Sequence, residues 1–239
     1  MIVRNFTFGR NHMNYVMSDL HGHFEKYKEM LKTIKLKDSD SLFLLGNVCD
    51  KGPAPFAIMQ DALMRCNIFP IIGECDYRAL RMLSKMNSEK AKNDPAFRAT
   101  FAKWLSEGGM TTVTEFRALD EEAQTDVLEF IRDEFVAYDE IKAGSTNYVL
   151  VHGGLPDFEK NKSLDSYSIK ELLAAEPDFS REYFDDKILV TGKTPTFMYS
   201  EDYRGRIYRR NGQIGINCGV AEGEDLACLC LDTGEEFYV

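Results

Sequence analysis

Five short apolar runs in this chain each end in a turn that contains glycine and carries polar side chains. The runs are NYVM, SLFLL, IFPII, NYVLV and KILVT, and the turns that follow them are SDLHG, GNVCDKG, GECD, HGG and GKT. Apolar runs of this length, bounded by turn residues, predict buried strands. Because α/β sheets place their ligand sites at the carboxyl ends of strands, we expect the five turns to meet in one site.

Helical patterns separate the first three of these strands. Residues 23–34 and 53–64 carry apolar side chains at helical spacing, and this alternation predicts a largely parallel sheet covered by helices. Residues 78 to about 140 are more charged and include an amphipathic pattern at 121–135, which predicts a helical insertion or cap. Short strands with glycine turns at 214–239 predict a hairpin or meander. With 239 residues, we expect one domain spanning 1–239.

The charge and the apolar content exclude some classes of partner. A formal net charge of -10 and a pI near 5.0 disfavour nucleic acid and anionic lipid as partners. No apolar run approaches the length of a membrane span, and the first residues lack the apolar core of a signal peptide. We therefore expect a cytoplasmic protein with no nucleic-acid or membrane partner.

Two further features have an ordinary structural interpretation. The six cysteines include no C-x-x-C pair, and most lie in apolar segments, so we expect free, buried thiols. The basic run YRGRIYRR at 203–210 fits either an acidic partner or the edge of a sheet, where charge discourages further strand pairing. We favour the edge.

Taken in order, the five polar turns resemble the motifs of the calcineurin-like metallophosphoesterases, in the branch of bacterial serine/threonine phosphatases and diadenosine tetraphosphatase-like proteins. The family pattern is G-D-x-H-G, G-D-x-x-D-R-G, G-N-H-E, H-[AG]-G and G-H-T, and the resemblance covers nearly the whole chain, including WLSEGGMTTVTEF in the helical part. It implies an α/β metallophosphoesterase fold: two central mixed sheets flanked by helices in four layers, with the helical insertion.

The resemblance also implies roles for individual residues. The family holds two divalent metal ions that bind phosphate oxygens and generate a hydroxide nucleophile. Asp19 and His21 match ligands of the first metal, and His152 matches a ligand of the second. The other positions depart from the family: Asn47 stands for the bridging aspartate, Glu74 for an asparagine ligand, Lys193 for a histidine ligand, Lys51 for the phosphate-binding arginine, and Cys75 for the catalytic histidine that Asp50 would orient.

These departures affect the metal centre and the proton donor together. The Asn47 amide lacks the charge and the second anionic oxygen that hold two cations close. An ammonium has no lone pair, so Lys193 cannot be a ligand unless it deprotonates. Because Glu74 and Lys193 replace ligands of the same ion, we expect an ion pair between them in place of the second metal. Cys75 as a nucleophile is disfavoured, because the nearby carboxylates Glu74 and Asp76 oppose a thiolate.

The sequence thus supports two functional hypotheses. The first is a serine/threonine phosphatase-like homologue with a degraded dinuclear site, weakly active or inactive, that binds a phosphorylated small molecule, a phosphoprotein or another partner. The second is an active phosphoesterase with an altered, mononuclear site at Asp19 and His21, which would hold one manganese, iron or zinc ion. A third class, an unrelated binding module that shares only the sheet, is disfavoured by the order of the motifs.

Overall fold

The first of two five-stranded sheets contains the first three predicted strands. A computed structural model describes residues 12–239 of the chain, and in it this sheet has the order β10-β9-β1-β2-β3. Strands β1, β2 and β3 are parallel, and β9 and β10 complete the sheet as an antiparallel hairpin. The bounds are β1 Asn14–Met17, β2 Ser41–Leu45, β3 Ile68–Ile71, β9 Ala227–Cys230 and β10 Glu236–Tyr238.

The second sheet contains the other two predicted strands at its centre. Its order is β4-β5-β6-β8-β7, with β5, β6 and β8 parallel and the edge strands β4 and β7 antiparallel to their neighbours. Strand β7 includes Arg209 and Arg210, so the basic run does lie at a sheet edge, as predicted. The bounds are β4 Tyr138–Ala143, β5 Thr146–Val151, β6 Lys187–Thr191, β7 Tyr208–Arg210 and β8 Gln213–Gly215.

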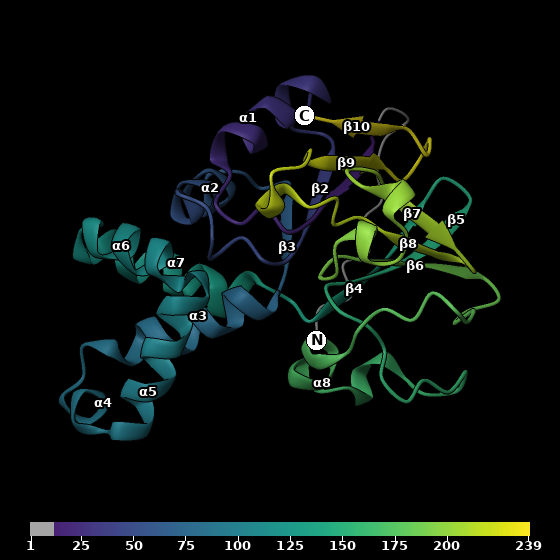
Figure 1. The fold of residues 1–239 in the computed structure, drawn as a ribbon. Coiled ribbons are helices and arrows are strands. Elements are labelled where there is room, and N and C mark those ends of the chain that lie inside the picture. Colours follow the sequence, from purple (N-terminus) through teal and green to yellow (C-terminus); the bar gives the residue numbers. More distant parts are fainter. Residues whose placement is uncertain (1–11) are drawn as a thin grey trace.

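The two sheets pack face to face, and helices cover their outer faces (Figure 1). Alternation along the strands divides the apolar residues between the layers: Val16 and Phe43 face the second sheet, whereas Met17 and Leu44 face the helices. Helices α1 Phe24–Thr33, α2 Pro55–Leu63, α3 Glu74–Met86 and α7 Glu121–Glu134 pack against the first sheet, and α8 Ile169–Ala174 packs against the second. The prediction of two mixed sheets flanked by helices is therefore confirmed.

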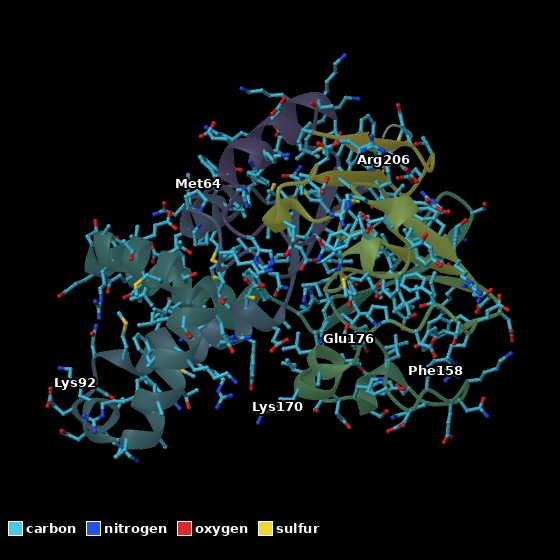
Figure 2. The ribbon with its side chains drawn as sticks, in the orientation of Figure 1. Met64, Lys92, Phe158, Lys170, Glu176 and Arg206 are labelled. Atoms are coloured by element: carbon cyan, nitrogen blue, oxygen red, sulfur yellow. The ribbon has the colours of Figure 1, made fainter. Side chains whose placement is uncertain are left out.

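The helical segment projects from the first sheet as an arm. It comprises α3, α4 Glu89–Asn93, α5 Pro95–Trp104, a π-helical turn at Leu105–Gly109, α6 Met110–Ala118 and α7. In Figure 1 α4 and α5 extend away from both sheets, and Figure 2 places Lys92 at the far end. The helices begin earlier than the predicted residue 78, because α3 starts directly at the turn after β3. No described helix is long and apolar enough to cross a membrane.

We predict that the layer between the sheets dominates the stability of the fold. Leu150 of β5 is fully buried there, so Leu150→Ala should lower the free energy of unfolding by about 2–5 kcal/mol. Met198 is 68% exposed, and Met198→Ala should change the free energy of unfolding by less than about 0.5 kcal/mol. Urea denaturation of both variants checks this. Equal effects of the two substitutions would contradict the assignment of the core.

Candidate functional site

The carboxyl ends of the central parallel strands of both sheets meet at one place, and the predicted site residues lie there. Asp19 and His21 follow β1, Asn47 follows β2 and Glu74 opens α3, while His152 and Lys193 follow β5 and β6. At this site two hydrogen bonds join the strand ends of one sheet to those of the other: the Lys193 backbone N–H donates to Asp19 Oδ2 at 2.9 Å, and His152 Nδ1 donates to the Leu45 carbonyl at 2.7 Å. Glycines permit this approach, since a Cβ on Gly192 would lie 2.6 Å from Asp19 Oδ2.

The backbone is strained at many of the predicted site residues. Of the nine non-glycine residues with positive φ in the described chain, six belong to the predicted site. Each such conformation costs about 1 kcal/mol or more for a side chain without a local compensating bond, and strain of this kind clusters at functional sites. The six are Asp19, His21, Asn47, Asp50, Lys51 and Lys193, with φ between 43° and 70°.

Asp19 is buried and its carboxylate is surrounded by hydrogen-bond donors. Asn47 Nδ2 donates to Asp19 Oδ1 at 2.8 Å, and the Ser18 hydroxyl and the Lys193 N–H both donate to Oδ2. The orientation of the Asn47 amide is fixed by its other end, because Oδ1 accepts the Cys75 backbone N–H at 2.9 Å. Asn47 therefore presents an NH₂ group to Asp19, where a bridging ligand would have to present an oxygen lone pair.

The two site histidines have the orientation of potential ligands. His21 Nδ1 donates to the Cys49 carbonyl at 3.0 Å, as His152 Nδ1 does to Leu45, so in the neutral ring each Nε2 carries a lone pair. Burial lowers the pKa of His21, against the opposing effect of Asp19, and this favours the neutral ring. His21 Nε2 lies 3.9 Å from Asp19 Oδ1, and His152 Nε2 is buried without a hydrogen-bond partner.

Lys193 has a closer partner than the predicted one. Its Nζ lies 3.1 Å from Glu176 Oε1 and donates to the Leu173 carbonyl at 2.6 Å, whereas Glu74 Oε2 is 4.0 Å away. The predicted Lys193–Glu74 pair is thus only at the outer limit of an ion pair. Glu176 follows α8 and lies on the side of that helix that faces the sheets (Figure 2). Sequence reasoning missed it, because no motif marks the loop after α8.

Asp50 connects the helical arm to the site. The Trp104 indole N–H donates to Asp50 Oδ2 at 2.8 Å, and the Thr112 hydroxyl donates to Oδ1 at 2.8 Å. Burial raises the pKa of Asp50, and these two hydrogen bonds, with a further one from Cys75, oppose the rise. Asp50 and Cys75 are therefore neighbours, as the resemblance implied. A histidine can be held by Asp50 through one ring nitrogen while the other nitrogen protonates the leaving group. A thiol has a single heteroatom and cannot do both.

Asp76, which the sequence marked only as a nearby carboxylate, organises the loops. It is fully buried, and it accepts the backbone N–H groups of Val48 and Cys49 at 2.9 Å and of Gly73 at 3.1 Å. Burial raises the pKa of Asp76, against the effect of these hydrogen bonds. Asp76 thus fixes the turn after β2 against the start of α3, and with it the position of Asn47.

The cations around the site are paired with carboxylates. Lys51 Nζ lies 3.1 Å from Glu222, and Arg78, which the motif comparison did not single out, bridges Glu74 at 3.2 Å and Glu107 at 2.9 Å. Lys193 is likewise paired with Glu176. All three cations near the site therefore have a carboxylate partner, which a phosphate group would have to displace in order to bind them. The side chain of Lys51 is 44% exposed, so its role as a replacement for arginine stays a prediction.

The donor set does not fit a dinuclear metal centre. Within residues 12–239, no three His, Cys, Asp or Glu side chains lie close enough together to hold a metal ion. The amide hydrogens of Asn47 and the ammonium of Lys193 face positions where the family has lone pairs. Asp19, His21 and His152 alone keep the ligand chemistry, so the roles of Asn47, Glu74 and Lys193 as ligands or replacements stay predictions.

We predict that Cys75 reacts slowly as a nucleophile. Burial raises its pKa well above the ordinary value, and Asp50 and Asp76 raise it further, so its thiolate is scarce at neutral pH. Cys66, in contrast, is exposed. With iodoacetamide at pH 8, peptide mass mapping should show rapid alkylation of Cys66 and much slower alkylation of Cys75. Faster reaction at Cys75 would restore the nucleophile hypothesis.

Solved structures with a similar fold include known phosphatases and phosphoesterases. The chain resembles the crystal structure of a candidate diadenosine tetraphosphatase, with a TM-score of 0.66 and 16% identity over 98% of this chain and 95% of that one. It also resembles a serine/threonine phosphatase from Saccharomyces cerevisiae, with a TM-score of 0.56 and 12% identity over 93% of this chain and 73% of that one. A metallophosphoesterase from Sphaerobacter thermophilus has a TM-score of 0.51 and 14% identity over 95% of this chain and 86% of that one. At such identities the likeness is one of fold. No curated protein sequence matches the chain.

The family itself follows from the sequence match. The model of the calcineurin-like phosphoesterases matches residues 15–216, which include every strand end of the site and the whole helical arm. The chain therefore belongs to the calcineurin-like phosphoesterase family.

Proposed function

We propose that this chain is a metallophosphoesterase homologue that hydrolyses phosphate esters poorly or not at all and acts by binding a partner. The observation that carries the proposal is the Asn47 amide, which donates to Asp19 and is locked in that orientation by the Cys75 N–H. For Asn47 to offer an oxygen to a metal, its amide would have to flip and give up both hydrogen bonds. The hydrogen bond from Asn47 thus satisfies the Asp19 carboxylate, which a metal ion would otherwise neutralise.

The chemistry of the family explains why this change matters. Two metal ions stabilise the phosphoryl charge and supply the hydroxide, and a histidine–aspartate pair protonates the leaving group. Here the bridging position carries an amide, the proton donor is a thiol with a raised pKa, and an ammonium lies near the second ion position. Such parts act as a unit, so their losses do not simply add, and restoring one of them should recover little.

The charge balance favours a partner other than a free phosphate group. Without metal ions, the carboxylates in and around the site outnumber the cations, and each cation is already paired. A phosphate dianion placed there would meet net negative charge and would have to displace a carboxylate from its partner. The cations are Lys51, Arg78 and Lys193, and the carboxylates are Asp19, Asp50, Glu74, Asp76, Glu107, Glu176 and Glu222.

One observation favours the second hypothesis, an enzyme with a mononuclear site. The Nε2 lone pair of His152 is buried and unpartnered, and buried polar groups usually have a partner. A single manganese, iron or zinc ion at His152 would satisfy it, although Asp19, His21 and His152 would have to move closer together to hold that ion jointly, since no three such side chains are grouped in residues 12–239. That ion would still lack the bridging carboxylate, and the ammonium of Lys193 would oppose it if it approached the second position.

Metal content and turnover test the proposal. Protein purified without chelator should carry well under one equivalent of manganese, iron or zinc by mass spectrometry. It should hydrolyse p-nitrophenyl phosphate with added manganese roughly 10³-fold more slowly than the combined variant Asn47→Asp, Cys75→His, Lys193→His.

The combined variant has a matched control of its own. Addition of Asp19→Asn to it should remove the metal again. Tight binding of two ions and ordinary turnover by the unaltered chain would contradict the proposal, and one tightly bound ion with turnover would establish the mononuclear enzyme instead.

A second prediction concerns the Asn47 amide alone. In Asn47→Asp a carboxylate replaces the NH₂ group 2.8 Å from Asp19, so the variant should lose about 2 kcal/mol or more of unfolding free energy in the absence of metal. Manganese should restore part of this loss, because a cation between two carboxylates removes their repulsion. Thermal denaturation with and without manganese measures both effects.

Asn67→Asp is the matched control. Asn67 is also buried, and it donates to the backbone carbonyls of Lys37 and Asp40 far from the site. This variant should be destabilised without rescue by manganese. If Asn47→Asp is as stable as the unaltered chain without metal, the Asn47–Asp19 hydrogen bond does not have the importance assigned to it.

A further inference from the structure

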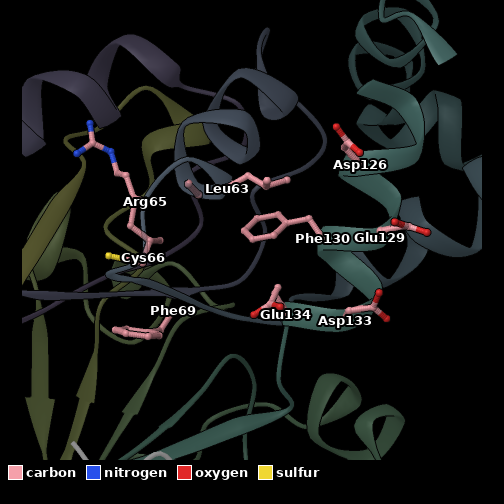
Figure 3. Close-up of a pocket in the computed structure, with 11 residues that line it drawn as sticks. Leu63, Arg65, Cys66, Phe69, Asp126, Glu129, Phe130, Asp133 and Glu134 are labelled. Carbon is pink, nitrogen blue, oxygen red and sulfur yellow. The ribbon is translucent and has the colours of Figure 1, made fainter. Parts of the chain in front are cut away.

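A cavity of about 510 Å³ lies between the end of α2, the start of β3 and the C-terminal part of α7 (Figure 3). None of its lining residues belongs to the candidate site. We call it the α2–α7 groove, defined by Leu63, Ile68, Phe69 and Phe130 on its apolar side and by the carboxylates of α7 on the other. Its volume lies in the range of about 300–1,000 Å³ that is usual for small-molecule sites, so it is large enough to take at least one or two side chains of a ligand.

One residue on the apolar side of the groove, Leu63, is open to solvent, whereas Ile68 and Phe130 are largely buried. Leu63 is 43% exposed, although it ends a helix whose other apolar residues are mostly buried. In Figure 3 Leu63 and the ring of Phe130 point into the same space, one from α2 and one from α7. A side chain that filled this space would cover Leu63, which has apolar surface exposed to water, and would contact the small part of Phe130 that is still accessible.

The polar side of the groove is acidic. Asp126, Glu129, Asp133 and Glu134 line it from α7, and the single cation among the lining residues is Arg65. Arg65 is already paired with Asp61 at 2.8 Å. Arg132 takes part of the α7 charge through Asp133 at 2.8 Å and Glu129 at 3.2 Å, but the groove keeps a net negative charge.

A second hollow extends the same surface. It holds about 400 Å³ and shares Arg65 and Cys66 with the groove. It adds two more carboxylates, Asp38 and Asp61, and one more apolar side chain, Met64, which is 85% exposed. The two hollows share lining residues and so form one continuous surface, in which the exposed apolar side chains Leu63 and Met64 lie among carboxylates.

We propose that the α2–α7 groove binds a segment of a partner protein in which apolar side chains are flanked by lysine or arginine. Leucine-, methionine- or phenylalanine-sized side chains would contact Leu63, Phe130 and Met64, and the basic residues would lie beside the carboxylates of α7. A second copy of this chain fits poorly, because three of the four arginines of its most basic run already pair with Glu201, Glu224, Asp225 and Glu236. The partner is therefore a different protein, and the groove goes beyond the proposed function of the phosphoesterase site.

The test selects peptides from a random displayed library on the full-length chain. Selected peptides, made synthetically, should combine apolar residues with lysine or arginine, and fluorescence anisotropy gives their affinity. Cys66 is exposed and lines the groove, so a bound peptide should slow its reaction with a maleimide. Rising salt should weaken binding, since part of the attraction is electrostatic.

Three variants separate the groove from general charge effects. Leu63→Lys should weaken binding about tenfold or more, by loss of apolar contact and by repulsion. Met198→Lys makes the same change of charge at an exposed apolar residue that lines neither hollow, and it should leave binding unchanged. The double variant Asp126→Lys, Glu129→Lys should weaken binding and reduce its salt dependence, without touching the apolar side.

Several results would overturn the proposal. These are selected peptides that are acidic or uncharged, a Cys66 reaction rate that no peptide changes, and equal weakening by Leu63→Lys and Met198→Lys. Protection of Cys66 by self-association, seen as a concentration-dependent dimer in sedimentation, would assign the groove to a second copy instead. Failure of the phosphoesterase proposal leaves these outcomes unchanged, because none of the measured residues lies in that site.

Discussion

The hydrogen bond from Asn47 to Asp19 is the interaction on which the character of the site depends. It joins the ends of β1 and β2, and the Lys193 N–H extends the same network to β6 of the other sheet. In a metal-bound centre, ions would hold these strand ends together by charge. Here amide and backbone donors satisfy the buried carboxylate, and Asp76 holds the loop that presents the amide. The positive φ angles at the turns show that the loops have a demanding backbone shape, which these hydrogen bonds help to hold.

Much of this arrangement could be predicted from the sequence, because it follows from strand position. Apolar runs that end in polar turns identified Asp19, Asn47, His152 and Lys193 as neighbours, and the parallel order of β1–β2 and β5–β6 brings them together. Helix periodicity located α1 and α2 to within a few residues. The predicted insertion began too late, since the turn after β3 has no loop of its own and leads directly into α3. Cys66 departs from the prediction of buried thiols because it lies in the exposed turn between α2 and β3.

What the sequence could not predict depends on contacts between distant segments. Glu176 reaches Lys193 only because the loop after α8 folds over the end of β6. The direction of the Asn47 amide depends on a backbone N–H 28 residues away. The groove likewise requires α7, the last helix of the arm in the sequence, to return beside α2. From the sequence alone, the acidic residues of α7 and the leucine at the end of α2 cannot be predicted to line one groove, because only the fold places them opposite one another. The two proposals together describe a member of the calcineurin-like phosphoesterase family that would act by binding partners.

The most direct measurement of the central claim is an anomalous difference map from crystals grown with manganese, at a resolution that distinguishes the amide nitrogen from the oxygen of Asn47 by its hydrogen-bond network. The account predicts no manganese peak between Asp19 and His152, with Asn47 Nδ2 within hydrogen-bond distance of Asp19 and Oδ1 on the Cys75 N–H. Two manganese peaks, with the Asn47 amide flipped so that its oxygen faces them, would contradict it.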